Sequence, residues 1–421
     1  MRTHLVAGPL LLLASFALGA APPEPAPIRL DSDADRRKAL LELNELSGTD
    51  PMRGRLKQLI DDRPERTKKL LATAAKMAKE KPQPFNRNTT FLLAMAAENA
   101  KEVSISAQFY RLNVAQSMAV GSERAVAVAY LGLIQTYQDN GKFSECEKAC
   151  REALEVEADE NGDLEGARPA IMRSMVTAVA RKGEHDRALK LIDGMLQADS
   201  RNWLNLALKG RILRGADKLE EAARVYLDVI KKVEKETRLK EAARLEYVDD
   251  YRYALSGIYA ELGEPEKAAA QLKLLVEREP DNPTYNNDLG FTYAEQGENL
   301  EEAEKLIRKA LDDDRKQRKA SPLYDADKDR DSAAYLDSLG WVLFKQGKPK
   351  EAKPHLLEAV KYEEGQHTEV YDHLAEVHVA LGEKAEAVAA WKKAVEAATS
   401  SKRDQKRKEQ IEKKLEKLQE K

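Results

Sequence analysis

The chain of 421 residues is rich in charged side chains, which make up 34%, and poor in aromatic ones, which make up 6%. Its 16 prolines and 21 glycines are too few for a β-sandwich or barrel that turns about every ten residues. A formal net charge of −3 gives no electrostatic reason to expect nucleic acid or an anionic membrane as the main partner. The composition therefore favours stacked amphipathic helices.

The first 21 residues differ from the rest of the chain. Arg2 and His4 precede an apolar run at 5–18, and small residues follow at 19–21. This order is typical of a secretory signal peptide, and the run is shorter than the roughly 20 residues of a membrane-spanning helix. We expect residues 1–21 to be removed, leaving no membrane anchor, and the protein to be periplasmic or secreted. The alternatives are an uncleaved anchor and a buried N-terminal helix.

A Pro-rich linker is expected at 22–35, because its prolines favour an extended chain. Asp31, Asp33 and Asp35 then form an acidic start for a helix over 36–46. Two more helices are expected at 54–61 and 65–79, and together they make an N-terminal helical region over 36–85.

From residue 86 the sequence repeats a unit made of an apolar helix, a turn residue and a second helix. A small residue follows the turn residue by five positions, or by six in one unit. The turn residues are Gly141, Gly183, Asp217, Gly263, Gly297, Gly347 and Gly382. They lie 42, 34, 46, 34, 50 and 35 residues apart. Helix or loop extensions explain the longer steps, and a period of about 34 residues indicates a helix–turn–helix repeat.

The units at 251–397 resemble the tetratricopeptide-repeat (TPR) family most clearly. Leu289-Gly290 with Tyr293, followed by Ala303 and Ile307, matches its pattern of small and large positions. The resemblance implies an all-α solenoid of about seven or eight repeats over 86–397, wound as a right-handed superhelix. Its least certain unit is the one at Leu93-Ala94.

The charged segment 398–421 is expected to form a polar capping helix, because the last apolar face of a repeat array must be covered. Ile411, Leu415 and Leu418 form an apolar stripe on this helix. Its Lys/Arg run is interpreted as a solvated face, since acidic residues interrupt it.

The resemblance also implies a concave surface lined by the second, fifth, ninth and twelfth residues of each first helix. In this register the lining residues are Tyr253, Asn287, Phe291, Asp337, Trp341 and Phe344, with Arg211 and Arg214 from an earlier unit. Their acidic neighbours are Glu369, Asp372 and Glu376. Aromatic groups rimmed by amide and acidic ones favour peptide binding. The alternative is that these side chains pack against adjacent helices or a terminal segment that folds back.

Motifs for catalysis, cofactors and metals are missing from the sequence, which contains no P-loop, G-x-G-x-x-G or G-x-S-x-G pattern. Cys146 and Cys150 lie four apart on one helix and are interpreted as buried packing residues. His378 occupies a repeat core position and is expected to be packed there. The four aspartates of 325–331 leave calcium binding open, although Arg330 and Leu336 stand where an EF-hand needs Gly and Glu.

These observations lead to a non-enzymatic scaffold or adaptor of the cell envelope that binds proteins or peptides. A second hypothesis is an enzyme accessory or a ligand- or calcium-binding protein that uses the N-terminal helices or the loop at 325–331. A third is RNA binding by a related helical repeat, which the signal-like N-terminus and the acidic balance oppose.

Overall fold

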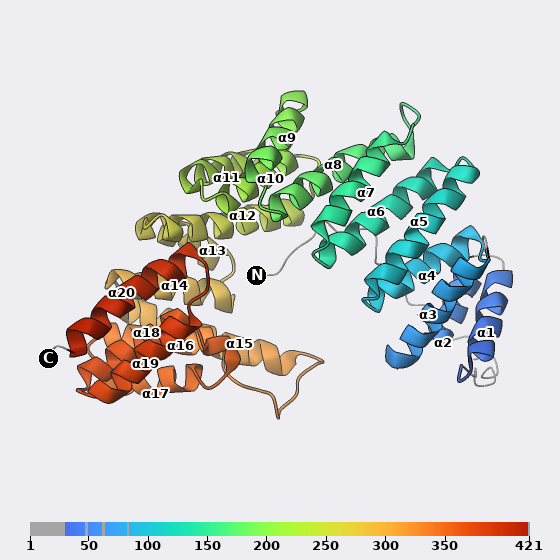
Figure 1. Cartoon of the computed structure of the whole chain (residues 1–421). Coiled ribbons are helices and arrows are strands. Elements are labelled where there is room, and N and C mark those ends of the chain that lie inside the picture. Colours follow the sequence, from blue (N-terminus) through green and yellow to red (C-terminus); the bar gives the residue numbers. More distant parts are fainter. Residues whose placement is uncertain (1–29, 47–48, 61–63, 82–83, 420–421) are drawn as a thin grey trace. The chain divides into compact units, whose positions relative to one another are not determined.

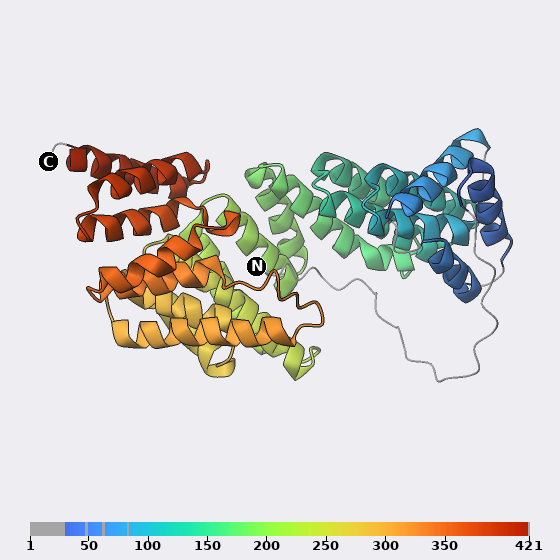
Figure 2. The same cartoon turned by 90° about the horizontal axis from the view of Figure 1, so that it is seen from below.

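The computed structural model describes residues 30–46, 49–60, 64–81 and 84–419, and all regular structure in these ranges is helical. The chain forms two compact units, divided between Lys182 and Gly183, and each is described by itself. Figures 1 and 2 show the helices of both units from two directions. The expected signal peptide at 1–21 and most of the expected linker lie outside the described residues.

Unit 1 begins with α1 (Asp33–Glu45), α2 (Thr49–Leu59) and α3 (Pro64–Glu80). The Ser32 side chain accepts a hydrogen bond from the Asp35 backbone N–H, and the Asp35 carboxylate accepts one from the Ser32 backbone in return. This capping box starts α1 three residues before the predicted start at Arg36, because Asp33 and Asp35 belong to the first helical turn.

Two helix pairs and a final helix complete unit 1. They are α4 (Arg87–Asn99) with α5 (Val103–Ala119), α6 (Glu123–Asp139) with α7 (Phe143–Glu155), and then α8 (Asp163–Arg181). The first pair corresponds to the least certain unit of the sequence and has the expected helix–turn–helix form. Its small residue Ser106 donates a hydrogen bond to the Ala94 carbonyl over 3.1 Å. Cys146 and Cys150 are unpaired and buried in α7, as predicted.

Unit 2 consists of α9, five helix pairs and a final helix. The elements are α9 (His185–Ala198), α10 (Trp203–Gly215), α11 (Leu219–Glu234), α12 (Glu241–Glu261), α13 (Pro265–Arg278), α14 (Pro283–Gln296), α15 (Leu300–Ala320), α16 (Ala333–Lys345), α17 (Pro349–Ala359), the 3-10 helix Glu363–Gly365, α18 (Thr368–Ala380), α19 (Lys384–Ala397) and α20 (Lys402–Gln419). In Figure 1 these helices follow one another from green to red.

All seven predicted turn residues adopt the left-handed conformation, with φ between 60° and 85°. Glycine reaches this region without a steric penalty, which explains why six of the seven are glycines. Asp217 adopts φ 60° at the remaining turn, where an aspartate tolerates the conformation better than most residues. The turn prediction is therefore confirmed.

The long steps between turns come from extended helices and loops. Both α12 and α15 have 21 residues, compared with 14 in α13 and α14. A loop at 321–332 then separates α15 from α16.

The two helices of a repeat approach closely at the small eighth position. A Cβ atom on Gly340 would lie 2.5 Å from Leu356 Cγ and 3.3 Å from the Ala352 carbonyl oxygen. A Cβ on Gly290 would similarly lie 2.7 Å from Ile307 Cγ1. The predicted small–large complementarity is thus present in the packing.

The last helix, α20, covers α18 and α19, as Figure 1 shows for the red end of the chain. Ile411 is fully buried, and Leu415 and Leu418 pack against the core, which confirms the predicted capping stripe. The interpretation of its basic run as a solvated face is wrong for Arg407 and Lys414, since these partly buried side chains form ion pairs with α18. Arg403 also forms an ion pair with α18 but stays exposed.

Candidate partner-binding surface

Four rings from α14, α16 and α18 gather in unit 2 and form what we call the aromatic patch: Phe291, Trp341, Phe344 and His373. The Trp341 ring stacks on the His373 imidazole with centroids 3.9 Å apart and planes at 13°. Trp341 also stacks with Phe344 at 5.2 Å, and Phe291 lies 6.2 Å from His373. Phe291, Trp341 and Phe344 are only partly buried, so the patch presents ring surface to solvent.

Polar groups at the edge of the patch fix the orientation of its central ring. The Trp341 indole N–H donates a hydrogen bond to the Glu295 carboxylate. The Lys345 ammonium lies 5.1 Å from the Trp341 ring centroid, within range of a cation–π interaction. Trp341 is therefore held by stacking, a hydrogen bond and a nearby cation.

The imidazole of the patch makes a buried contact with a carboxylate. His373 is 1% exposed, and its Nδ1 lies 2.9 Å from Asp337 Oδ1. Burial opposes the charged imidazolium, but the carboxylates of Asp337 and Glu369 outweigh it and raise the pKa of His373. His373 could not be assigned to the patch from the sequence, because its partner Asp337 stands 36 residues earlier, in the preceding repeat.

Two predicted lining residues are buried instead of exposed. Asp337 is 6% exposed and Asn287 is 5% exposed. The first helices of successive repeats pack so closely that the fifth-position side chain is enclosed: Asp337 faces His373 of the next first helix. For Asp337 this contact agrees with the alternative, packing against an adjacent helix. Whether they influence a bound partner stays a prediction.

Tyr253 belongs to a second cluster at the junction of α12 and α14. Its hydroxyl donates a hydrogen bond to Asp288 Oδ2 over 2.8 Å, and its ring lies 5.5 Å from Tyr285. Burial raises the pKa of Asp288 even though Tyr253 and Asn287 donate hydrogen bonds to it. Asp288, the hydrogen-bond partner of Tyr253, is not among the residues that the repeat register predicts.

The two predicted arginines lie on α10 and differ in exposure. Arg211 is exposed. The Arg214 guanidinium forms an ion pair with Glu261 of α12, with Nε 3.2 Å from Oε1. Arg214 is therefore engaged by the neighbouring repeat, and a partner-binding role for the two arginines stays a prediction.

The three acidic neighbours on α18 are covered by the capping helix. Glu369 accepts hydrogen bonds from Arg403 and Arg407, each over 2.6 Å. Lys414 contacts Asp372 at 2.8 Å and Glu376 at 2.7 Å. For this part of the surface the alternative of a terminal segment that folds back is correct, because α20 supplies the opposite charge.

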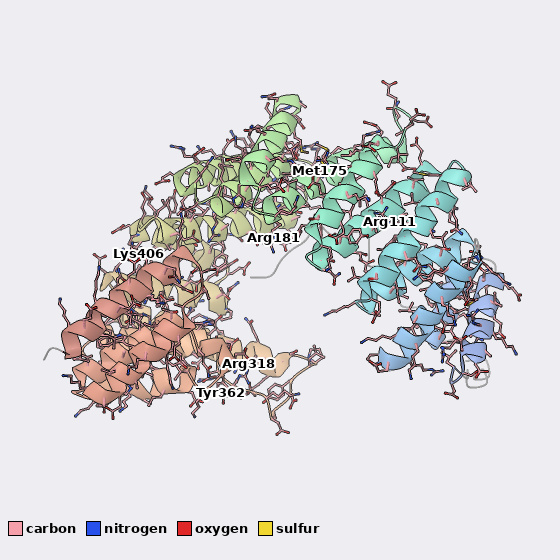
Figure 3. All side chains as sticks on the ribbon, viewed as in Figure 1. Arg111, Met175, Arg181, Arg318, Tyr362 and Lys406 are labelled. Atoms are coloured by element: carbon pink, nitrogen blue, oxygen red, sulfur yellow. The ribbon has the colours of Figure 1, made fainter. Side chains whose placement is uncertain are left out.

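The loop at 321–332 is held to α15 by its own aspartates. Asp329 lies 2.9 Å from the Nε of Arg318, the residue labelled on α15 in Figure 3, and Asp331 lies 2.7 Å from that of Arg315. The Arg330 guanidinium lies 4.4 Å above the Tyr362 ring. In the part of the chain that the structure describes, no three His, Cys, Asp or Glu side chains converge as a metal ion would need.

The helices of the described ranges are each too short or too polar to cross a membrane.

Comparison with known proteins identifies the repeat. Residues 253–319 and 338–402 match the model of the tetratricopeptide repeat family. A TPR repeat-containing protein of Pseudomonas aeruginosa is 36% identical over 90 residues, which is 21% of this chain but only 13% of that protein. The chain thus spans a small part of the length of this curated relative.

The chain is also similar to solved structures. One is a tetratricopeptide repeat protein from Parabacteroides merdae, with 14% identity, a TM-score of 0.49, and coverage of 68% of this chain and 98% of that one. Another is MamA from Desulfovibrio magneticus, with 18% identity, a TM-score of 0.36, and coverage of 47% and 96%.

Helix pairs with left-handed turns, close packing at the eighth position and the family match agree with one another. Proteins of this family bind other proteins or peptides and are generally scaffolds without enzymatic activity. Residues 253–402 therefore carry repeats of the tetratricopeptide type.

Proposed function

We propose that this protein is a non-enzymatic adaptor of the cell envelope and that the aromatic patch of unit 2 holds a segment of its partner. The location rests on the signal-like pattern of residues 1–21. The binding role rests on one observation above all: Trp341 is stacked on His373 yet still partly exposed.

A fixed and exposed aromatic ring is well suited to binding. Aromatic side chains dominate the energy of many protein interfaces, and they bind best when surrounding groups exclude water. Because stacking and the Glu295 hydrogen bond already order Trp341, a ligand does not have to freeze its rotamers. Glu295 and Lys345 at the edge can then give polar contacts that orient the bound segment.

The test is affinity capture from an envelope fraction after chemical crosslinking. We compare the wild-type chain with a Phe291→Ala, Trp341→Ala double variant and with Tyr324→Ala as a control. Tyr324 is a 40% exposed aromatic residue in the loop at 321–332, which is not part of the patch. Partners that use the patch are captured by wild type and the control but lost from the double variant.

Because Trp341 also contacts His373, the double variant requires a check of its fold. Circular dichroism and a thermal unfolding curve show whether its helices are retained. If it is folded and recovers every partner as well as wild type does, the aromatic patch is not the binding surface.

A further inference from the structure

A cleft in unit 1 lies between two first helices, α6 and α8. Its volume is about 590 Å³. The residues that line it are Arg124, Ala127, Val128 and Leu131 of α6, and Asn161, Gly162, Asp163, Gly166 and Ala167 at the start of α8. None of these residues belongs to the aromatic patch.

Small side chains on α8 create the cleft, and aliphatic ones on α6 form its floor. A Cβ atom on Gly166 would meet nothing within 4 Å. Opposite it, Val128 is 43% exposed, although valine is usually among the more buried residues. The cleft therefore leaves apolar surface open and has room for an aliphatic side chain.

Arg173 continues the same face of α8. It follows Gly166 by seven residues, which is two helical turns or roughly 10 Å along the axis. The side chain is partly buried, and burial lowers the pKa of Arg173. Across the described ranges, no Asp or Glu oxygen lies within 4 Å of its guanidinium nitrogens.

Two other arginines of unit 1 do have acidic partners. On the same helix, Arg168 Nε lies 2.5 Å from Glu165, and on α5 Arg111 lies 2.6 Å from Glu152. Partial burial of a cation without an acidic partner costs free energy, which an arriving carboxylate would recover. The other end of the cleft carries one cation and one anion, Arg124 and Asp163, both exposed.

We propose that the α6–α8 cleft is a second docking site, which takes an extended segment of a partner protein carrying an aliphatic side chain and an acidic side chain. The aliphatic group enters between Val128 and Gly166, and the Asp or Glu carboxylate pairs with Arg173. The proposal does not depend on the aromatic patch, so either site can fail while the other stands.

The test uses the full chain and a fluorescein-labelled, C-terminally amidated peptide of sequence Gly-Ser-Leu-Asp-Leu-Asp-Ser-Gly. Binding is followed by fluorescence polarisation. Arg173→Gln removes the charge and is expected to weaken binding about tenfold, as loss of a charge-assisted hydrogen bond would. Gly166→Leu fills the cleft and is expected to weaken it at least as much. Arg53→Gln, at an exposed position of α2, leaves binding unchanged.

Gly166→Leu has free space at its Cβ and improves helix propensity, so it is not expected to disturb the fold. A peptide with Asn in place of both Asp residues should bind wild type as weakly as the acidic peptide binds Arg173→Gln. Three results would overturn the proposal: equal binding of the acidic peptide to wild type and Arg173→Gln, no binding to wild type, or tighter binding of the Asn peptide with a free C-terminal carboxylate. The last result would assign the cleft to chain ends.

Discussion

At the scale of single residues, the contact between Gly340 and α17 shows how tightly a repeat is packed. A Cβ on Gly340 would overlap with Leu356 and approach the Ala352 carbonyl oxygen, which is backbone and cannot rotate away. We expect Gly340→Ala to lower the free energy of unfolding by about 1–3 kcal/mol through overpacking. Urea unfolding followed by circular dichroism measures the change.

Gly194 in α9 is the matched control for that substitution. A Cβ there would meet nothing within 4 Å, so Gly194→Ala gains helix propensity without a clash. It should raise the unfolding midpoint slightly, by up to about 1 kcal/mol in free energy. If the free energy of unfolding changed in the same direction in Gly340→Ala and Gly194→Ala, the close approach of α17 to Gly340 would not explain the effect.

Asp249 in α12 gives a pH dependence that can be tested. Burial raises its pKa to about 6, although Arg278 lies 2.8 Å away and acts in the opposite direction. The folded protein therefore binds this proton more tightly than the unfolded chain does. Protonated Asp249 therefore contributes to the free energy of unfolding at low pH. This contribution, about 2 kcal/mol, is lost as the pH rises between about 4 and 6.

Asp249→Asn removes this titration. The free energy of unfolding of the variant, relative to wild type, should therefore increase by about 2 kcal/mol between pH 4 and pH 7. Asp327→Asn, which replaces an exposed carboxylate of the loop at 321–332, is the control. A constant difference between Asp249→Asn and wild type across this pH range would show that burial of Asp249 does not control the effect.

At the scale of elements, the capping helix α20 is held by one fully buried side chain and several ion pairs. Ile411 has no exposed surface, whereas the ion pairs involve partly exposed groups and are individually weak. We expect Ile411→Ala to lower the free energy of unfolding by about 2–5 kcal/mol. Thermal and urea unfolding measure this, with Lys413→Ala at an exposed position of the same helix as the control. Similar losses for both variants would mean that α20 does not close the apolar face of unit 2.

The sequence predicts the ends of helices where the backbone conformation or the burial pattern requires a particular type of residue. Positive φ marks the turns, and the apolar stripe of residues 411–418 marks the cap. The extra length of α15 and the placing of the loop at 321–332 were not predictable in detail. They depend on ion pairs such as Arg315 with Asp331, which join residues 16 apart that no repeat register relates.

At the scale of the whole molecule, export is the untested part of the proposed function. Expressed in a Gram-negative host with its own residues 1–29, the chain should be recovered from the periplasmic fraction. Mass spectrometry should find a new N-terminus after Gly19 or Ala21. Replacing Leu11 and Leu12 with Arg should abolish this processing, because the apolar core of the signal is interrupted. Full-length wild-type protein in the cytoplasm would remove the envelope from the proposal.

The sequence by itself determined the helical class, the repeat, its turns and the polar cap, because these depend on spacing along one helix or across one turn. It also placed Phe291, Trp341 and Phe344 on one face. Only the tertiary structure decided which of these side chains stay exposed and that the His373 ring stacks on Trp341. Such contacts join residues of different repeats. The position of a residue within its own repeat does not show which charged or aromatic side chain of the neighbouring repeat will lie against it.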